Sequence, residues 1–400
     1  MRIGYKHTMY ACYTGFIVQA TINNFIPLLF VTFQTSYGIP LSQITFLVTF
    51  NFGIQLVTDL IAAAFVDKIG YRISCILAHV FGALGLISLA ILPDLLADPF
   101  TGLLISVFIY GVGGGLLEVL MNPVAGACPV DNKASAISLL NSFYSWGSVG
   151  IVLLSTIFFS AFGLENWKVL ALIWAIIPIF NIFLFAKVPI GSMIKEGEQK
   201  MSLKSLLSYK VFWIMLVLML SAGACEQAII QWASTFVEQG LGISKTIGDL
   251  AGPMSFAFMM GISRLLYSRI GHRLDIKKAL MFSGLLCLVC VLILALSPWP
   301  ILGLIACAVC GFSVGILWPG AISLSVASIR LGGTTMFAFL ALAGAVGCTL
   351  GPTVVGTVSS AAGDNLTAGF LAAAIFPLLM IFGIIAYHIH AKKHPSDSRA

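Results

Sequence analysis

Two short basic segments decide the fold: Asp67-Lys-Ile-Gly-Tyr-Arg72 and Ser268-Arg-Ile-Gly-His-Arg273, half a chain apart in a sequence of 400 residues. Both segments lie between long apolar runs. A second pattern repeats at nearly the same distance, because Gly111 and Gly115 return as Gly311 and Gly315. Halves that repeat at this spacing in so hydrophobic a chain indicate a duplicated membrane bundle.

The composition requires lipid as the solvent. The chain is 59% hydrophobic and 9% charged, whereas a soluble domain is about 45–50% apolar and about 25% charged. The apolar runs do not alternate with polar residues as the strands of a membrane barrel do. We therefore expect an all-α membrane protein with twelve transmembrane helices in two six-helix bundles, near residues 8–34, 42–66, 73–93, 99–125, 134–161, 167–187, 211–238, 246–268, 277–297, 300–327, 333–361 and 365–391.

The polar stretch at 188–210 divides the chain. We expect an N-terminal bundle at 1–187, a cytoplasmic linker at 188–210, and a C-terminal bundle with a short cytoplasmic tail at 211–400. With the N-terminus in the cytoplasm, Lys168 and Lys245 alone among the 21 lysines and arginines fall on the opposite side. This bias predicts cytoplasmic termini in a multi-pass protein of the cytoplasmic (inner) membrane.

The same bias accounts for the net charge of +6. The charge therefore gives no reason to expect nucleic acid as a partner. The expected partners are the lipid bilayer and a small-molecule substrate, and we expect a monomer.

Two six-helix halves related along the membrane normal resemble the major facilitator superfamily over the whole chain. The 67–72 turn is similar to the superfamily's signature between the second and third helices. Here Ala63 replaces the usual leading glycine, and Tyr71 interrupts the basic pair. The resemblance implies a cytoplasmic gate, for which the candidates are Asp67, Arg72, Arg264 and Arg273.

A narrower resemblance lies in the fourth and fifth helices. The segments at 111–123 and 141–147 are similar to the fucose–proton symporter group, which includes sodium- or proton-linked glucose carriers. That group has a glutamate at the position of Glu118. It also has an aspartate in the first helix, where this chain has only Asn23 and Asn24. The missing aspartate therefore argues against assigning fucose specificity or a proton mechanism with two carboxylates to this chain from the resemblance.

Three carboxylates fall well inside the expected spans, and no lysine or arginine is expected beside them. Burying such a charge costs about 2.5–3.5 kcal/mol on insertion scales, so each is a functional candidate. The proton-coupling candidates are Glu118, Glu226 and Asp59. The alternative for Glu118 is a carboxyl that only bonds neighbouring helices, and for Asp59 it is a role in the gate with Asp67.

Amide, phenol and indole groups on the same helices suit a hydroxyl-rich ligand, because amides both donate and accept and aromatic rings stack on sugars. The alternative is hydrogen bonding between helices. The substrate-binding candidates are Gln19, Asn23, Asn122, Asn141, Tyr144, Gln227, Gln231, Trp232 and Trp318.

No catalytic constellation or nucleotide-binding loop is evident, so the sequence does not predict an enzyme. Two CxxC pairs, which begin at Cys287 and Cys307, lie inside apolar helices, where we expect packing and no metal. The sequence instead predicts alternating access with proton-coupled uptake of a sugar or another small neutral polar solute. Sodium as the coupling ion remains open, no cofactor is expected, and the alternative is a proton-coupled exporter of amphiphilic drug-like or metabolic compounds.

Overall fold

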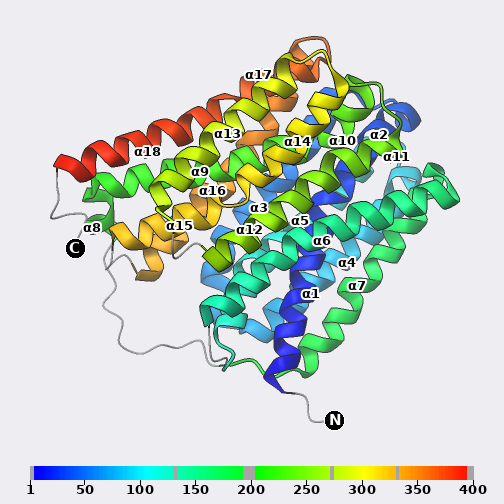
Figure 1. Cartoon of the computed structure of the whole chain (residues 1–400). Coiled ribbons are helices and arrows are strands. Elements are labelled where there is room, and N and C mark those ends of the chain that lie inside the picture. The colour runs from blue at the N-terminus through cyan, green and yellow to red at the C-terminus, as the bar shows by residue number, and fades with distance from the viewer. Residues whose placement is uncertain (1–3, 130–132, 192–202, 271–273, 330–332, 394–400) are drawn as a thin grey trace. The chain divides into compact units, whose positions relative to one another are not determined.

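The computed structural model describes residues 4–129, 133–191, 203–270, 274–329 and 333–393 (Figure 1). Throughout these residues the regular elements are helices, which confirms the expected all-α class. Eleven helices in the described part are long and apolar enough to span a membrane. The remaining expected span, 246–268, is interrupted: it consists of α11 (Lys245–Asp249), the π-helix η4 (Leu250–Met254) and α12 (Ser255–Ile270).

The residues group by their contacts into two compact units. The first contains Met1–Ile194 together with Val237–Ala257. Within it, α5 contacts α3 and α4, while α1 contacts α6. Besides α11 and η4, its elements are α1 (Tyr5–Asn24), the 3-10 helix η1 (Ile26–Leu29), α2 (Phe30–Tyr37), α3 (Leu41–Ile69), α4 (Tyr71–Leu95), α5 (Pro99–Gly126), α6 (Lys133–Phe162), the 3-10 helix η2 (Leu164–Asn166) and α7 (Trp167–Lys187).

The second unit contains Lys195–Phe236 and Phe258–Ala400. Its first long helix, α9, contacts α16 and α18. The elements are α8 (Leu203–Ser208), α9 (Lys210–Ile230), α10 (Ala233–Thr235), most of α12, α13 (Ile276–Leu296), α14 (Pro300–Val314), α15 (Leu317–Ser328), α16 (Gly333–Ala361), α17 (Leu366–Ala373) and α18 (Ile375–Lys393). The π-helix η3 (Phe236–Gly240) begins where the chain leaves this unit.

The expected division at 188–210 places 237–257 in the C-terminal half, whereas these residues pack with the first six helices. Residues 192–202 of the expected linker lie outside the described residues. The division into two six-helix domains by chain order stays a prediction.

The first basic segment forms a joint inside the first unit. A single residue, Gly70, separates α3 from α4 with φ +86° and ψ 149°, a conformation that L side chains rarely adopt. One turn on, Arg72 Nη1 donates to the carbonyls of Phe185 (2.8 Å) and Ala186 (3.0 Å). Arg72 therefore supplies donors to the last turn of α7, where helical carbonyls have no intrahelical partner.

Small residues in the repeat allow helices to approach closely in both units. A Cβ added to Gly147 in α6 would lie 3.2 Å from the Cα of Ile17 in α1. In the second unit, a Cβ on Gly347 in α16 would lie 2.0 Å from the carbonyl oxygen of Leu220 in α9. The expectation that these glycines serve helix packing is confirmed, because the backbone fills the space where a side chain would be.

We predict that Gly70→Ala destabilises the protein by about 1–3 kcal/mol, because alanine is strained at this φ and ψ. Gly53→Ala in α3 is the matched control. An added Cβ meets no atom within 4 Å at either position, but φ is positive only at Gly70. The midpoint of thermal unfolding in detergent should fall for Gly70→Ala and not for Gly53→Ala. Equal midpoints for the two variants would show that the turn tolerates a side chain.

Candidate functional site

A run of glycines in α5 brings the polar face of α3 against it. A Cβ on Gly114 would lie 2.9 Å from Gln55 Cδ, and a Cβ on Gly115 would lie 3.1 Å from Asp59 Oδ1. Neither helix could approach the other so closely if α5 had larger residues here. Glu118 follows Gly114 and Gly115 by one turn, so the same approach places it near the polar face of α3.

The carboxylate of Glu118 has an amide neighbour from α1. Gln19 Nε2 donates to Glu118 Oε2 at 3.3 Å. Gln19 is 4% exposed, and its Oε1 is a buried acceptor without a hydrogen-bond donor among the described residues. Asp59 Oδ1 is likewise buried, and it has no hydrogen-bond donor among the described residues. An unfilled buried acceptor is costly, so these two oxygens mark places where a donor would be stabilising.

Asn23 connects α1 to two further helices. Its Oδ1 accepts from Gln55 Nε2 at 2.9 Å and from Asn51 Nδ2 at 3.5 Å, both in α3. Its own Nδ2 donates to the hydroxyl of Tyr144 in α6 at 3.4 Å. Together with Gln19 and Glu118, these residues link four helices of the first unit, α1, α3, α5 and α6. We call this set the first polar cluster: Gln19, Asn23, Asn51, Gln55, Asp59, Glu118 and Tyr144.

Asn122 and Asn141 form a separate pair in the first unit. Asn141 Nδ2 in α6 donates to Asn122 Oδ1 in α5 at 3.3 Å. Because Asn122 lies one turn beyond Glu118 on the same face of α5, the pair extends the polar surface along that helix. Asn122 and Asn141 therefore bond across two helices, while their contact with a substrate stays a prediction.

In the second unit, Glu226 is paired. Arg264 Nη2 in α12 lies 2.8 Å from Glu226 Oε2, and the two side chains are 15% and 8% exposed. The expectation that no basic residue reaches Glu226 is therefore wrong. It failed because a long arginine side chain carries its charge far from its own backbone position. Arg264 lies at a buried carboxylate here, and its role in a cytoplasmic gate stays a prediction.

The remaining substrate-binding candidates of the second unit contact other residues of that unit. Gln231 Nε2 donates to Gln227 Oε1 at 3.1 Å, so these amides form an i, i+4 pair. Trp232 is fully buried, and its indole donates to the carbonyl of Pro352 at 2.9 Å. Trp318 packs against Gly344, where a Cβ would lie 2.3 Å from the ring. Ligand contacts of these four residues stay predictions.

Two gate candidates cannot be placed. Arg273 lies outside the described residues, and the side chain of Asp67 lies outside them too. Arg72 is described, and its guanidinium donates to carbonyls of α7. The gate formed by these residues therefore stays a prediction.

One buried carboxylate was missed in the sequence. Asp249 is 1% exposed, and Lys245 Nζ lies 3.1 Å from its Oδ2. Asp249 lies near the start of the expected span 246–268, so it is not among the three carboxylates expected well inside the spans. The available signal was Lys245, which lies four residues earlier and is one of the two basic residues outside the cytoplasmic group.

His79 and the cysteines have the buried positions typical of packing residues. The ring of His79 is fully buried, with Nδ1 2.7 Å from the carbonyl of Cys75 and Nε2 2.7 Å from Asn181 Nδ2. The first contact requires Nδ1–H and the second requires an acceptor, so we assign a neutral ring. The cysteines, Cys348 excepted, are buried, and Cys287 Sγ lies 3.9 Å from Cys310 Sγ.

Comparison with known proteins identifies the fold. The family model described as the Major Facilitator Superfamily matches residues 11–352. A solved structure of the E. coli fucose:proton symporter FucP is 18% identical, with 94% of this chain and 98% of that chain covered and a TM-score of 0.65. The D-xylose-proton symporter is 14% identical, with 94% and 95% covered and a TM-score of 0.74.

The nucleoside transporter NupG is also similar, at 14% identity with 95% and 98% of the two chains covered and a TM-score of 0.74. No curated protein sequence matches this chain. At these identities the solved structures show a shared fold.

We predict that breaking the Glu226–Arg264 pair on one side is more harmful than removing both charges. Arg264→Met leaves a buried carboxylate without its partner, which typically destabilises a protein by about 3–5 kcal/mol. The double variant Arg264→Met/Glu226→Gln should recover part of this loss in thermal unfolding of the purified protein. If the double variant unfolds at or below the temperature of Arg264→Met, the pair does not carry this interaction.

Proposed function

Because the chain belongs to the Major Facilitator Superfamily and is a membrane transporter, we propose that it couples proton movement to uptake of a small neutral polar solute, most simply a sugar. The observation that carries this proposal is the first polar cluster, in which a carboxylate lies among neutral amide groups from neighbouring helices. Such a site offers two carboxylates, Glu118 and Asp59, that can take up a proton, and several amides that can bind hydroxyls.

We assign proton coupling to Glu118. Its carboxylate accepts from the neutral Gln19 amide, whereas Glu226 has a positive partner in Arg264. A proton on Glu226 would leave the buried Arg264 charge uncompensated, whereas the Gln19 amide can bond Glu118 in either protonation state. Negative charges on both Asp59 and Glu118 would repel one another, because the close approach of α3 and α5 brings the two carboxylates near each other, and proton uptake by either group relieves this repulsion.

A neutral, hydroxyl-bearing solute suits the acceptors of the first polar cluster. The free Oε1 of Gln19 can accept from a hydroxyl, and a rotation of the Asn23 or Gln55 amide can provide further donors and acceptors. The similar structures include proteins described as fucose and xylose symporters and as a nucleoside transporter. The amide pair Gln227–Gln231 offers matching groups in the second unit.

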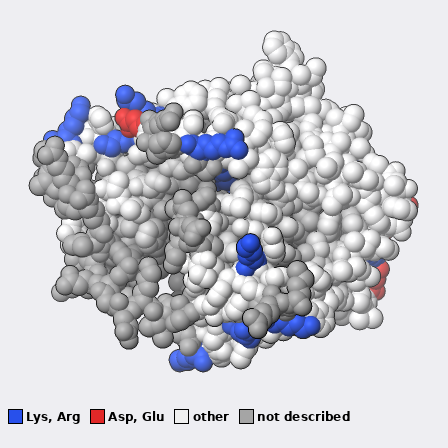
Figure 2. Space-filling view, turned by 60° about the horizontal axis from the view of Figure 1, so that its bottom comes forward, with Lys and Arg blue, Asp and Glu red and all other residues white. Residues whose placement is uncertain are grey.

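We further propose that the protein lies in the cytoplasmic membrane with both termini inside the cell. The sequence assigns all lysines and arginines except Lys168 and Lys245 to the cytoplasmic side, and Figure 2 shows several such side chains at the surface with few acidic ones beside them. Short loops with this bias set the orientation of membrane proteins. The gate role of Arg72 would then belong to the cytoplasmic end of the first unit.

Thermal-shift screening of the purified protein tests the substrate class. We expect stabilisation by one or more monosaccharides, because a ligand that binds the folded protein raises its unfolding temperature. Hydrophobic cations serve as the comparison. Stabilisation by the cations alone would contradict the sugar proposal and favour export of amphiphilic compounds.

We predict that Glu118→Gln loses at least about tenfold of the solute accumulation driven by a proton gradient in proteoliposomes, since glutamine cannot carry the proton. Exchange of labelled for unlabelled solute, which needs no net proton movement, should persist. Glu165→Gln, the same change at an exposed position, is the control. Undiminished uphill accumulation by Glu118→Gln would remove Glu118 as the coupling group, and accumulation driven by sodium instead of protons would change the assigned ion.

A further inference from the structure

The segment Val237–Ala257 lies between two parts of the second unit in the sequence, but it packs with the first unit. We call these residues the strap. The strap contains α11 and η4, and it includes Lys245, which the orientation of the chain places apart from nearly all other basic residues. The proposed transport function assigns no role to this lysine.

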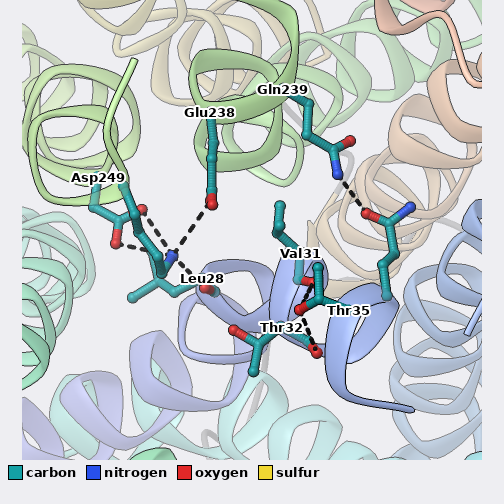
Figure 3. A network of polar contacts seen from close by, with 9 residues as sticks. Leu28, Val31, Thr32, Thr35, Glu238, Gln239 and Asp249 are labelled. Carbon is teal, nitrogen blue, oxygen red and sulfur yellow. Dashed lines mark hydrogen bonds and ion pairs between the residues drawn. The ribbon is translucent and has the colours of Figure 1, made fainter. Parts of the chain in front are cut away.

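The Lys245 ammonium is surrounded by oxygen atoms (Figure 3). Nζ donates to the carbonyl of Leu28 at 2.5 Å and lies 3.1 Å from Asp249 Oδ2 and 4.0 Å from Glu238 Oε2. The carboxylates belong to the strap, whereas Leu28 belongs to the first span. Lys245 therefore both balances the negative charge of the strap and bonds it to the N-terminal helices.

The carbonyl of Leu28 is available because the first span is interrupted there. Helix α1 ends at Asn24, and η1 is a single 3-10 turn that contains Pro27. The change from 3-10 to α geometry where η1 meets α2 disturbs the regular i to i+4 bonding. A carbonyl in such a turn is a suitable acceptor for an external ammonium.

Two weaker contacts fix the strap along the same unit. Gln239 Nε2 donates to Gln34 Oε1 in α2 at 2.7 Å (Figure 3), and the hydroxyls of Ser160 in α6 and Thr246 are 3.3 Å apart. The strap thus contacts α2 within the first span and the end of α6. These contacts are polar, so water can replace them when the surfaces separate.

Both ends of the strap are irregular. The π-helix η3 begins at Phe236, and the π-helix η4 with Pro253 ends at Met254, close to the two points where the chain changes unit. Segments of π-helix are rare and often occur at functional sites, and proline weakens helical bonding. Such positions can absorb the backbone rotation that a moving segment requires.

We propose that the strap is a movable gate on the side opposite the cytoplasmic linker, and that the Lys245 ammonium is the latch that holds it closed against the Leu28 carbonyl. This inference rests on the proposed function, because alternating access requires one side to close while the other opens. A latch made of charged groups suits reversible opening. Its attraction is strong while water is excluded, and hydration of the separated groups compensates for its loss.

Cross-linking between the strap and α2 tests the latch. Cysteines at Gln34 and Gln239, in a protein whose native cysteines are replaced, would be joined by a short bifunctional thiol reagent when the strap is closed. We expect Lys245→Met to slow cross-linking by about tenfold and Lys245→Arg to preserve most of the rate. Cross-linking of Lys245→Met at the parent rate would overturn the inference.

Lys168→Met is the matched control. Lys168 is the other basic residue outside the cytoplasmic group, and it pairs with Asp94 inside the first unit without touching the strap. Its replacement should leave cross-linking unchanged. A similar loss in both lysine variants would show a general effect of removing charge and would also overturn the latch.

Chemical rescue of Lys245→Ala and a second variant, Asp249→Asn, distinguish loss of the latch from a folding defect. Adding n-propylammonium to Lys245→Ala should restore cross-linking, whereas tetramethylammonium, which cannot donate a hydrogen bond, should not. Asp249→Asn should slow cross-linking in the same direction as Lys245→Met. Absence of both effects would contradict a role of the ammonium and its counter-charge.

The measurement needs neither a solute nor an ion gradient, so it separates the two proposals. Normal cross-linking in Lys245→Met with active proton-driven uptake would remove the latch and leave the transport proposal intact. A latch that behaves as expected in a protein without proton-driven uptake would contradict only the proposed coupling.

Discussion

A charged group inside a membrane has no water to bond, so the protein itself must supply its partner. This constraint accounts for the buried charges that the structure describes. Glu226 lies against Arg264, and Asp249 lies against Lys245. Each pair lies within one compact unit. Within each pair, the opposite charge stabilises the buried group in place of water.

Glu118 satisfies the same constraint with a neutral group, because the amide of Gln19 donates to its carboxylate. A neutral partner bonds both the charged and the protonated carboxyl, whereas a cation strongly favours the charged form. Charge pairs therefore suit positions that hold structure or close a gate, and a carboxyl among amides suits a position where a proton is bound and released. This difference assigns distinct roles to carboxylates of the same chemical type.

The fold could be largely predicted, because hydrophobic runs and a repeated turn are local properties of the sequence. The expected spans other than 246–268 agree with the observed helices, and Gly147 in α6 and Gly347 in α16 lie at close helix contacts. Helical periodicity places Gln19 and Asn23 on one face of α1, but the contact between Gln19 and Glu118 joins helices distant in sequence. The Arg264–Glu226 pair and the strap could not be predicted, since both depend on contacts between segments distant in sequence and on the non-α geometry of η3 and η4.

The central claim is that solute entry and proton entry are one event at the first polar cluster. The most direct measurement follows the internal pH of proteoliposomes with a trapped dye, without any imposed gradient, after addition of the monosaccharide that stabilises the protein best. The account predicts that the interior becomes more acidic as the sugar enters, and that this signal is absent with Glu118→Gln. Entry of the sugar without any change in internal pH would contradict it.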